Sequence, residues 1–456
     1  MSGSGYIVGL GIASYEWMAA LTLLIVGKYF LPIFLKNEIY TMPQYLEQRF
    51  DSRVRTIMAV FWLAVYVFVN LTAVLWLGGL AIETIAGVDI VYGMIFLGLF
   101  SIAYSLYGGL KAVAYTDIIQ VVLLVFGGLV LTYISLDLVS EGNGLIAGFS
   151  ILTEQMPEKF DMIFSPDSPH YANLPGLSVL IGGLWIMNLS YWGFNQYIIQ
   201  RALAAKDLKE AQKGIAFAAY LKLLVPFFVV IPGIAAAILF ADLERPDEAY
   251  PSLMNLMPVG LKGLVFAALV AAIVSSLASM CNSVSTIFTM DVYAHYKKNA
   301  SQTHYVMVGR IASLVALIIA MLCARPLLGK FDQAFQYIQE FTGFFTPGIV
   351  VIFLLGMFWK TMNANGAIVA AIGSAILSFA LKFMLPTIPF MDRVGIVFLL
   401  CLALSIAVSK LTQKNSQNEN LETVSLDDIS FKTETSFNIL SLSVIIILIA
   451  FYAAWW

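Results

Sequence analysis

Apolar runs of about 20 residues recur along the whole chain, separated by shorter polar stretches. A helical run of that length crosses the roughly 30 Å hydrocarbon core of a bilayer. After a short opening fragment, the pattern predicts twelve spans: 12–35, 54–82, 88–107, 112–137, 177–200, 211–241, 260–290, 304–324, 334–359, 365–385, 391–410 and 436–456. The expected fold class is therefore an all-α polytopic membrane protein.

Two longer polar stretches interrupt this pattern. Leu138 to Pro175 is expected to be a long polar loop, and 411–435 a hydrophilic linker. The loops on the face that contains 36–55 carry about twice as many Lys and Arg residues as the loops on the opposite face. The positive-inside rule makes that face cytoplasmic and puts the 138–175 loop outside.

Composition removes several classes of function. Hydrophobic residues make up 60% of the chain and charged residues only 12%, whereas soluble domains average about 25% charged residues. The net charge of −3 gives no indication of nucleic-acid binding. Neither Gly-Lys dipeptide is followed by Ser or Thr, so no phosphate-binding loop of an ATP-driven pump is present. The spans contain no nucleophile–base pair or metal cluster typical of an enzyme.

The predicted span 177–200 is unusually polar near its middle and inner half. It contains Asn188, Ser190, Tyr191, Trp192 and two further amides within one apolar run. Polar groups in hydrocarbon need partners, so this stretch indicates a helix that lines a cavity or is broken beside one. The alternative is polar contact between packed helices, which membrane bundles also use.

The first ten residues are too polar to span a membrane. Gly3 and Gly5, with two serines, are typical of an unwound helix centre that is followed by a second half-helix. A disordered N-terminal tail is the alternative.

Lys222 is the strongest single candidate for function. It lies nine residues beyond Lys213, or about 13 Å into the membrane core. A charge at that depth needs a partner or a water-filled site, because it costs roughly 2.5–3.5 kcal/mol on insertion scales. The interpretation is a binding residue, and the alternative is a structural ion pair.

Small and hydroxyl residues follow one another in 271–279. Ser275 and Ser276, with a nearby carbonyl, would provide hard oxygen ligands for a small cation, although close helix packing explains the same pattern. Three further candidates also have ordinary explanations as interfacial acids or helix-end residues: Glu16, Asp117, and the Phe335/Gln339 pair, four apart on one helix face.

Three of these motifs together resemble the sodium:solute symporter family, and most closely its sodium/glucose cotransporter group. They are Ala-Ala-Ile-Val-Ser-Ser-Leu-Ala-Ser at 271–279, Tyr-Trp-Gly-Phe-Asn-Gln-Tyr-Ile-Ile-Gln-Arg at 191–201, and Gln-Ala-Phe-Gln-Tyr-Ile-Gln-Glu at 333–340. The resemblance implies a LeuT-like core of two inverted five-helix repeats with additional C-terminal helices. It divides the chain into a transporter core at 1–359, peripheral helices at 360–410, a cytoplasmic linker at 411–435 and a last span at 436–456.

Within that core, the resemblance makes residues 1–8 the outer half of the first core helix and 177–200 its symmetry mate. Both helices are expected to be broken, in agreement with the residue patterns. Met1 would then correspond to an internal methionine of a longer chain.

The resemblance also assigns roles, position by position. Sugar contacts fall on Glu16, Asn188, Lys222 and Gln339. The inner gate falls on Tyr191 with Trp192 beside it, the outer gate on Met1, Tyr15 and Phe335, and an ion-path aspartate on Asp117. The implied sodium ligands are the carbonyl of Ala272 and the hydroxyls of Ser275 and Ser276. Ala19 departs from the pattern, because galactose-transporting members of the group have a serine there.

The resemblance thus predicts a secondary active transporter of the cell (inner) membrane. Sodium would be co-transported with a neutral, galactose- or glucose-like sugar by alternating access, and sugar, sodium and the bilayer would be the partners. Alternatives are a sodium symporter for inositol, sialic acid or proline, and a sugar sensor on the same scaffold.

Overall fold

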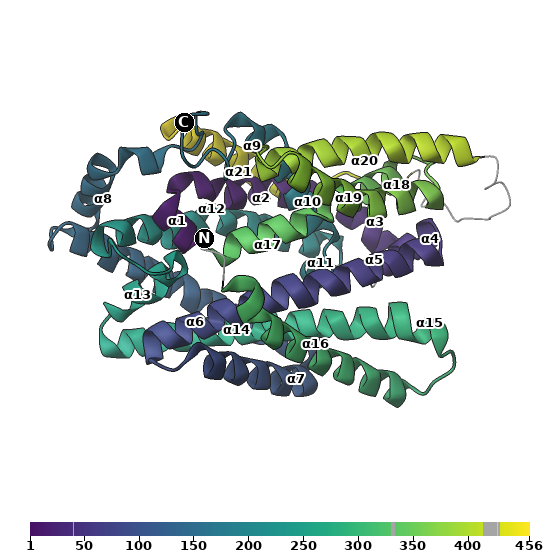
Figure 1. The fold of residues 1–456 in the computed structure, drawn as a ribbon, viewed down its shortest axis with the longest axis horizontal. Coiled ribbons are helices and arrows are strands. Elements are labelled where there is room, and N and C mark those ends of the chain that lie inside the picture. Colours follow the sequence, from purple (N-terminus) through teal and green to yellow (C-terminus); the bar gives the residue numbers. More distant parts are fainter. Residues whose placement is uncertain (40, 330–332, 414–425, 427–428) are drawn as a thin grey trace.

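The computed structural model describes residues 1–39, 41–329, 333–413, 426 and 429–456, and for residues 105–115 it describes the backbone alone. Every regular element in these residues is a helix. Figure 1 shows the helices running mainly along one long axis, with α8 and α13 at one end and α4 and α15 at the other. These two ends correspond to the faces predicted as external and cytoplasmic.

The N-terminal half contains α1 (Ser2–Ile7), η1 (Leu10–Ala13), α2 (Ser14–Ile25), η2 (Val26–Phe30), α3 (Leu31–Lys36), α4 (Met42–Arg49), α5 (Ser52–Val65), η3 (Tyr66–Leu71), α6 (Thr72–Ala86), α7 (Ile90–Val139), α8 (Gly144–Gln155), η4 (Pro157–Phe160), α9 (Leu177–Ile181), α10 (Gly183–Phe194) and α11 (Gln196–Leu203).

The C-terminal half contains α12 (Leu208–Leu239), η5 (Pro246–Glu248), α13 (Ala249–Asn255), α14 (Val259–Thr286), η6 (Ile287–Tyr293), α15 (Ala294–Tyr296), α16 (Gln302–Leu328), α17 (Ala334–Gly343), α18 (Thr346–Phe358), α19 (Ala364–Met384), α20 (Phe390–Thr412) and α21 (Thr435–Ala454).

Side-chain caps fix where several long helices begin. Asp207 accepts a hydrogen bond from the backbone N–H of Glu210 at the start of α12, and Ser301 caps α16 in the same way through His304. Such a cap is worth about 1 kcal/mol, because it satisfies a backbone donor that has no partner within the helix. The predicted span boundaries shift outward to these capping residues.

Nine helical stretches of the described chain are long and apolar enough to cross a membrane, and ten if the bent pair α17–α18 counts as one span. The two halves of that pair meet at 48°. The polytopic all-helical architecture predicted from the hydrophobic pattern is confirmed.

Helix α7 covers both the fourth and the third predicted spans. Within α7, Thr116–Val139 is long and apolar enough to cross a membrane, whereas Ile90–Tyr104 is a shorter apolar helix. The expectation of two separate spans here stays a prediction.

Two sequence expectations are corrected. Gly3 and Gly5 lie within helix α1 and are not unwound; a Cβ there would lie 2.6 Å from the Pro246 carbonyl oxygen and 2.8 Å from that of Val230. Glycine is used at these positions for close backbone approach. The 138–175 segment is not simply a loop, because Gly144–Gln155 forms α8.

The expected break in 177–200 is confirmed. Helix α10 ends where Asn195 adopts an extended conformation (φ −90°, ψ 120°), and α11 begins at the next residue. The short α1 likewise ends at Ile7, and two residues later Gly9 has a φ of +90° that only glycine adopts readily. Transporter helices that are interrupted in this way direct backbone and side-chain polar groups into a cavity.

The C-terminal helices lie outside this centre. Helix α21 packs on α2 and α12, where Trp17 stacks on Phe451 with ring centroids 4.8 Å apart. Most of the predicted linker, residues 414–425 and 427–428, lies outside the described residues. The division into core, peripheral helices and linker stays a prediction.

Candidate functional site: a central polar cavity and an ion path

A cavity of about 220 Å³ lies among α2, η3, α10, α12 and α17. Every predicted sugar contact lines it, as do the predicted gate residues on α2, α10 and α17. The lining residues are Tyr15, Glu16, Ala19, Asn70, Leu184, Met187, Asn188, Tyr191, Trp192, Asn195, Lys222, Phe335, Ile338, Gln339 and Thr342.

Helical spacing explains why these side chains converge. Asn188, Tyr191 and Trp192 are three and four residues apart, so they share one face of α10. On α17 the same rule aligns Phe335, Gln339 and, one turn further, Thr342. Helix α10 ends at the break at Asn195, which lies at the inner end of the cavity.

The charge of Lys222 is balanced inside the cavity. Its ammonium lies 2.5 Å from Glu16 Oε2 and 4.5 Å from the centroid of the Trp192 ring. Both charged side chains are more than four-fifths buried. The partner predicted for Lys222 is therefore Glu16, and removing either member would leave a buried charge uncompensated, at a cost of about 3–5 kcal/mol.

Several amides and hydroxyls in the cavity still have capacity for a ligand. Trp192 Nε1 donates to Asn188 Oδ1 over 3.1 Å, but Asn188 Nδ2 has no partner among the described residues, and neither does Thr342 Oγ1. A buried polar atom without a partner costs about 1–3 kcal/mol. A ligand that carries several hydroxyl groups would satisfy both atoms.

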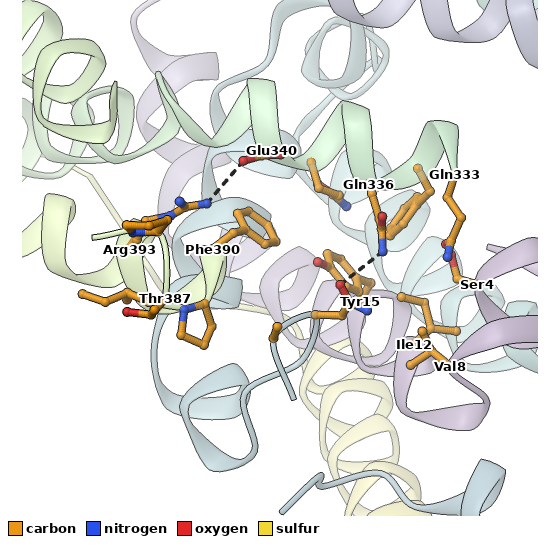
Figure 2. Close-up of a pocket in the computed structure, with 17 residues that line it drawn as sticks. Ser4, Val8, Ile12, Tyr15, Gln333, Gln336, Glu340, Thr387, Phe390 and Arg393 are labelled. Carbon is orange, nitrogen blue, oxygen red and sulfur yellow. Dashed lines mark hydrogen bonds and ion pairs between the residues drawn. The ribbon is translucent and has the colours of Figure 1, made fainter. Parts of the chain in front are cut away.

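On the predicted external side, one ring pair separates this cavity from a second one. The rings of Tyr15 and Phe335 meet edge to face with centroids 5.0 Å apart, and both residues line both cavities. Figure 2 shows the outer cavity of about 240 Å³, in which Glu340 faces Arg393. Met1, the third predicted outer-gate residue, lines neither cavity.

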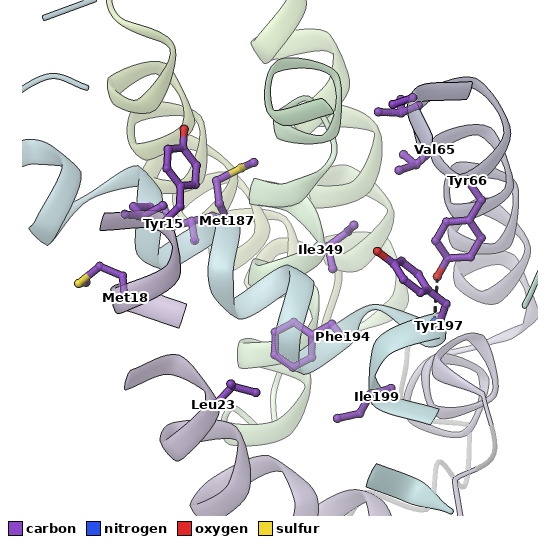
Figure 3. Close-up of a cluster of buried hydrophobic side chains, with 14 of the residues drawn as sticks. Tyr15, Met18, Leu23, Val65, Tyr66, Met187, Phe194, Tyr197, Ile199 and Ile349 are labelled. Atoms are coloured by element: carbon purple, nitrogen blue, oxygen red, sulfur yellow. Dashed lines mark hydrogen bonds between the residues drawn. The ribbon is translucent and has the colours of Figure 1, made fainter. Parts of the chain in front are cut away.

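On the predicted cytoplasmic side, hydrogen-bonded aromatic residues close the cavity. Tyr191 contacts Trp192, and its hydroxyl lies 2.5 Å from that of Tyr197. Behind them, the buried Tyr66 hydroxyl donates to Asn195 Oδ1 over 2.6 Å. Figure 3 shows this hydroxyl facing Tyr197, whose backbone N–H donates to it over 3.4 Å. Trp192 also lines an inner cavity of about 450 Å³ between α2, α11 and α12.

The predicted sodium ligands lie on α14, outside the central cavity. The Ser275 hydroxyl donates to Asp117 Oδ1, which brings a predicted ion ligand and the predicted ion-path residue together. Asp117 Oδ2 in turn accepts from Arg201 over 2.8 Å. Ala272 and Ser276 are half-buried on the same helix and line neither the central nor the inner cavity.

Sequence reasoning assigned no specific role to four polar residues that the structure brings into these sites: Asn70, Asn195, Arg201 and Thr342. Asn70 was detectable, because it is an amide inside the apolar span that forms η3. Asn195 and Arg201 lie inside the 191–201 motif, and Thr342 lies two residues beyond the 333–340 motif. The direction in which their side chains point could not be predicted without the helix breaks.

The family model for the Sodium:solute symporter family matches residues 1–373. The chain belongs to this family. It is a sodium-coupled solute symporter and a multi-pass membrane protein, and so a transporter and not an enzyme.

Similar relatives narrow the subgroup. A "Sodium/glucose cotransporter" of Vibrio parahaemolyticus is 51% identical over 474 residues, which cover all of this chain and 87% of that protein. A "Sodium/myo-inositol cotransporter 2" of Oryctolagus cuniculus is 34% identical over 409 residues, which cover 83% of this chain and 60% of that protein. The chain therefore matches less than two thirds of the inositol cotransporter's length.

A solved structure supports the fold. A Na⁺-coupled sialic acid symporter in a substrate-bound outward-open state matches with a TM-score of 0.77 and 24% identity, covering 90% of this chain and 85% of that one. The expected LeuT-like architecture of inverted repeats with further C-terminal helices is thereby confirmed.

Proposed function

We propose that this symporter couples sodium entry across the cell (inner) membrane to the uptake of a neutral, galactose- or glucose-like sugar. The chemistry of the central cavity carries the proposal. It combines an internally neutralised ion pair, amides with free hydrogen-bonding capacity and an aromatic face, in a volume below the roughly 300–1,000 Å³ typical of drug-sized ligands.

Sugar hydroxyls would bond to Glu16, Lys222, Asn188 and Gln339, while a sugar face stacks on Tyr191. Asn70 and Thr342 add two further polar groups on the same cavity wall. A site built for hydroxyl groups rejects analogues that lack them, because its own buried polar groups are left unpaired. Ala19 offers no hydrogen bond, so the preference among hexoses depends on the remaining contacts.

The charge balance favours a neutral solute over sialic acid or another anion. Glu16 and Lys222 are the only charged residues in the described cavity lining, and they bond to each other. An anionic substrate would need a cation that is not already paired. Inositol, a neutral polyol, remains the nearest alternative, since inositol cotransporters are also relatives.

Sodium would bind at Ser275 and Ser276 with the Ala272 carbonyl and leave past Asp117. Tyr15, Phe335 and Met1 would close the outer side, and Tyr191 with Trp192 the inner side. Sodium binding that favours the outward-open state would improve sugar affinity, and the coupling must be reciprocal.

The direct test is uptake of labelled galactose by the purified chain in proteoliposomes, with and without an inward sodium gradient. Accumulation that disappears when potassium replaces sodium is the expected result. Folded protein that shows no sodium-dependent galactose or glucose uptake would contradict the proposal, and the same assay with labelled inositol tests the alternative. Counterflow distinguishes a transporter from a sensor, because a sensor does not exchange labelled for unlabelled sugar.

The site assignment is tested by Lys222→Met. We expect uptake to fall at least 100-fold, because the substrate loses a donor and Glu16 is left as a buried charge without its partner, which alone costs about 3–5 kcal/mol. Lys213→Met, on the exposed surface of the same helix, is the matched control and should transport normally.

A double variant, Glu16→Gln with Lys222→Met, separates binding from charge balance. It should fold, because no unpaired charge remains, and should still fail to transport. Normal uptake by either Lys222 variant would show that the cavity is not the substrate site.

A further inference from the structure

Arg201 bonds to Asp117, the residue of the predicted ion path, although the proposed sodium route assigns Arg201 no role. Its Nη2 lies 2.8 Å from Asp117 Oδ2 and 3.0 Å from Ser279 Oγ, and its Nη1 donates to the Tyr197 carbonyl over 3.2 Å. Since Ser275 donates to the other oxygen of Asp117, both carboxylate oxygens are engaged.

The Arg201 guanidinium occupies the Asp117 carboxylate to which a sodium ion on this path would bind. Sodium takes hard oxygen ligands, and Asp117 is the one carboxylate bonded to a predicted sodium ligand in the described network. A guanidinium and a sodium ion on one carboxylate repel each other. The two cations are therefore alternative partners of the Asp117–Ser275 pair.

The structure also contains a place for the guanidinium when it leaves Asp117. Arg201 lines the inner cavity of about 450 Å³, whose lining includes the exposed carboxylate of Glu210. Glu210 pairs with Lys213 over 2.8 Å, and its two oxygens have further acceptor sites. The Arg201 side chain is 37% exposed, so it can turn into this cavity without being desolvated further.

Arg201 is mechanically connected to the inner closure of the sugar cavity. It lies on α11, directly after the break at Asn195, and α11 packs against α14, which carries Ser275. The same short helix carries Tyr197, whose hydroxyl meets Tyr191. A change of partner at Asp117 thus acts on the helix that supports the inner gate.

We propose that Arg201 is a tethered cation that exchanges with sodium at Asp117. With sodium absent from the path, the guanidinium bonds to Asp117 and holds α11 and the Tyr191–Tyr197 contact in place. Sodium on its way to the cytoplasm displaces the guanidinium into the inner cavity and releases α11. Arg201 is a positioning residue in this scheme, which rests on the proposed sodium route.

The test measures sodium binding without transport. Bound sodium raises the thermal unfolding temperature of the folded chain. We measure this rise for the full chain in detergent, with potassium keeping the ionic strength constant, and determine the sodium concentration that gives half of the maximal rise. Removing a competitor tightens sodium binding, so Arg201→Gln should lower this concentration at least fivefold, within the usual range of coupling between sites. Arg201→Lys, which keeps the charge but not the planar fork, should fall in between.

Two controls isolate the competition. Arg310→Gln removes an exposed arginine that has no ion-pair partner among the described residues, and it should leave sodium binding unchanged. In an Asp117→Asn background, Arg201→Gln should have no further effect on sodium affinity, because the shared partner is gone.

A purely structural ion pair predicts the opposite outcome. Folded Arg201→Gln with unchanged or weaker sodium binding would overturn the exchange. If Ser275→Ala retained the full sodium response of the unmodified chain, sodium would bind elsewhere; the proposed sodium site would then be wrong, and the exchange with it.

Discussion

The outer and inner boundaries of the central cavity are held in different ways. The outer boundary is an edge-to-face contact between Tyr15 and Phe335, and no hydrogen bond joins the two rings. The inner boundary consists of Tyr191, whose hydroxyl meets that of Tyr197, and of the Trp192 indole beside it. The indole donates to Asn188 and lies under the Lys222 ammonium. The groups expected to bind substrate therefore also hold the inner boundary.

This difference indicates how the two sides respond to a ligand. A sugar hydroxyl that takes the Asn188 carbonyl oxygen competes directly with Trp192, whereas nothing in the outer ring pair is displaced by it. Occupancy of the site would loosen the inner boundary first, in the direction that alternating access requires for release.

The largest effect is expected from Asn195→Ala, on the inner side. The substitution leaves the buried Tyr66 hydroxyl without its acceptor, at a cost of about 1–3 kcal/mol, or roughly 5- to 150-fold in the closed–open equilibrium. The measurement uses a cysteine introduced in the cavity by Ala19→Cys, in a Cys323→Ser background. The rate at which a thiol reagent added on the cytoplasmic side labels this cysteine should increase roughly 5- to 150-fold. An unchanged rate would mean that this hydrogen bond does not hold the inner side closed.

A smaller effect is expected from Phe335→Leu, on the outer side. An aromatic pair contributes about 0.5–1.5 kcal/mol beyond its buried area, so labelling of Ala19→Cys from the external side should rise about 2- to 10-fold. Cytoplasmic labelling serves as the control and should not rise. If this variant opened the protein more than Asn195→Ala does, the contrast between the two boundaries would be wrong.

The smallest effect is expected at the rim of the outer cavity. Glu340 pairs with Lys382 at 2.9 Å and with Arg393 at 3.3 Å, and such partly exposed pairs are worth about 0–1 kcal/mol. Glu340→Gln should raise external labelling less than about fivefold, and the increase should shrink in high salt because ions screen the original pairs. A salt-independent effect would show that these pairs act as buried contacts.

Much of this fold was predictable because a bilayer imposes a length on every apolar run. Polar side chains within those runs, such as Lys222 and Asn188, were equally conspicuous, since a polar group in hydrocarbon needs a partner or a water-filled site. The convergence of Glu16 with Lys222 was not predictable from spacing, because the two residues lie 206 positions apart. It was implied by the family resemblance alone.

The contacts that sequence reasoning could not supply depend on helix breaks and crossings. Arg201 reads as an ordinary cytoplasmic residue at a helix end, and only the change of direction at Asn195 brings it to Asp117. Gly3 and Gly5 indicated an unwound segment because glycine suits both irregular backbone and close packing, and here packing against Pro246 and Val230 explains them.

The pairing of Glu16 with Lys222 also has an electrical consequence. With these two charges cancelled and a neutral sugar bound, the only uncompensated charge that a loaded central site moves across the membrane is that of sodium. The number of elementary charges that cross the membrane per transported sugar molecule then equals the number of sodium ions transported with it. Each such charge is worth about 2.3 kcal/mol per 100 mV, so every 100 mV of membrane potential would multiply the attainable sugar gradient roughly 50-fold per ion.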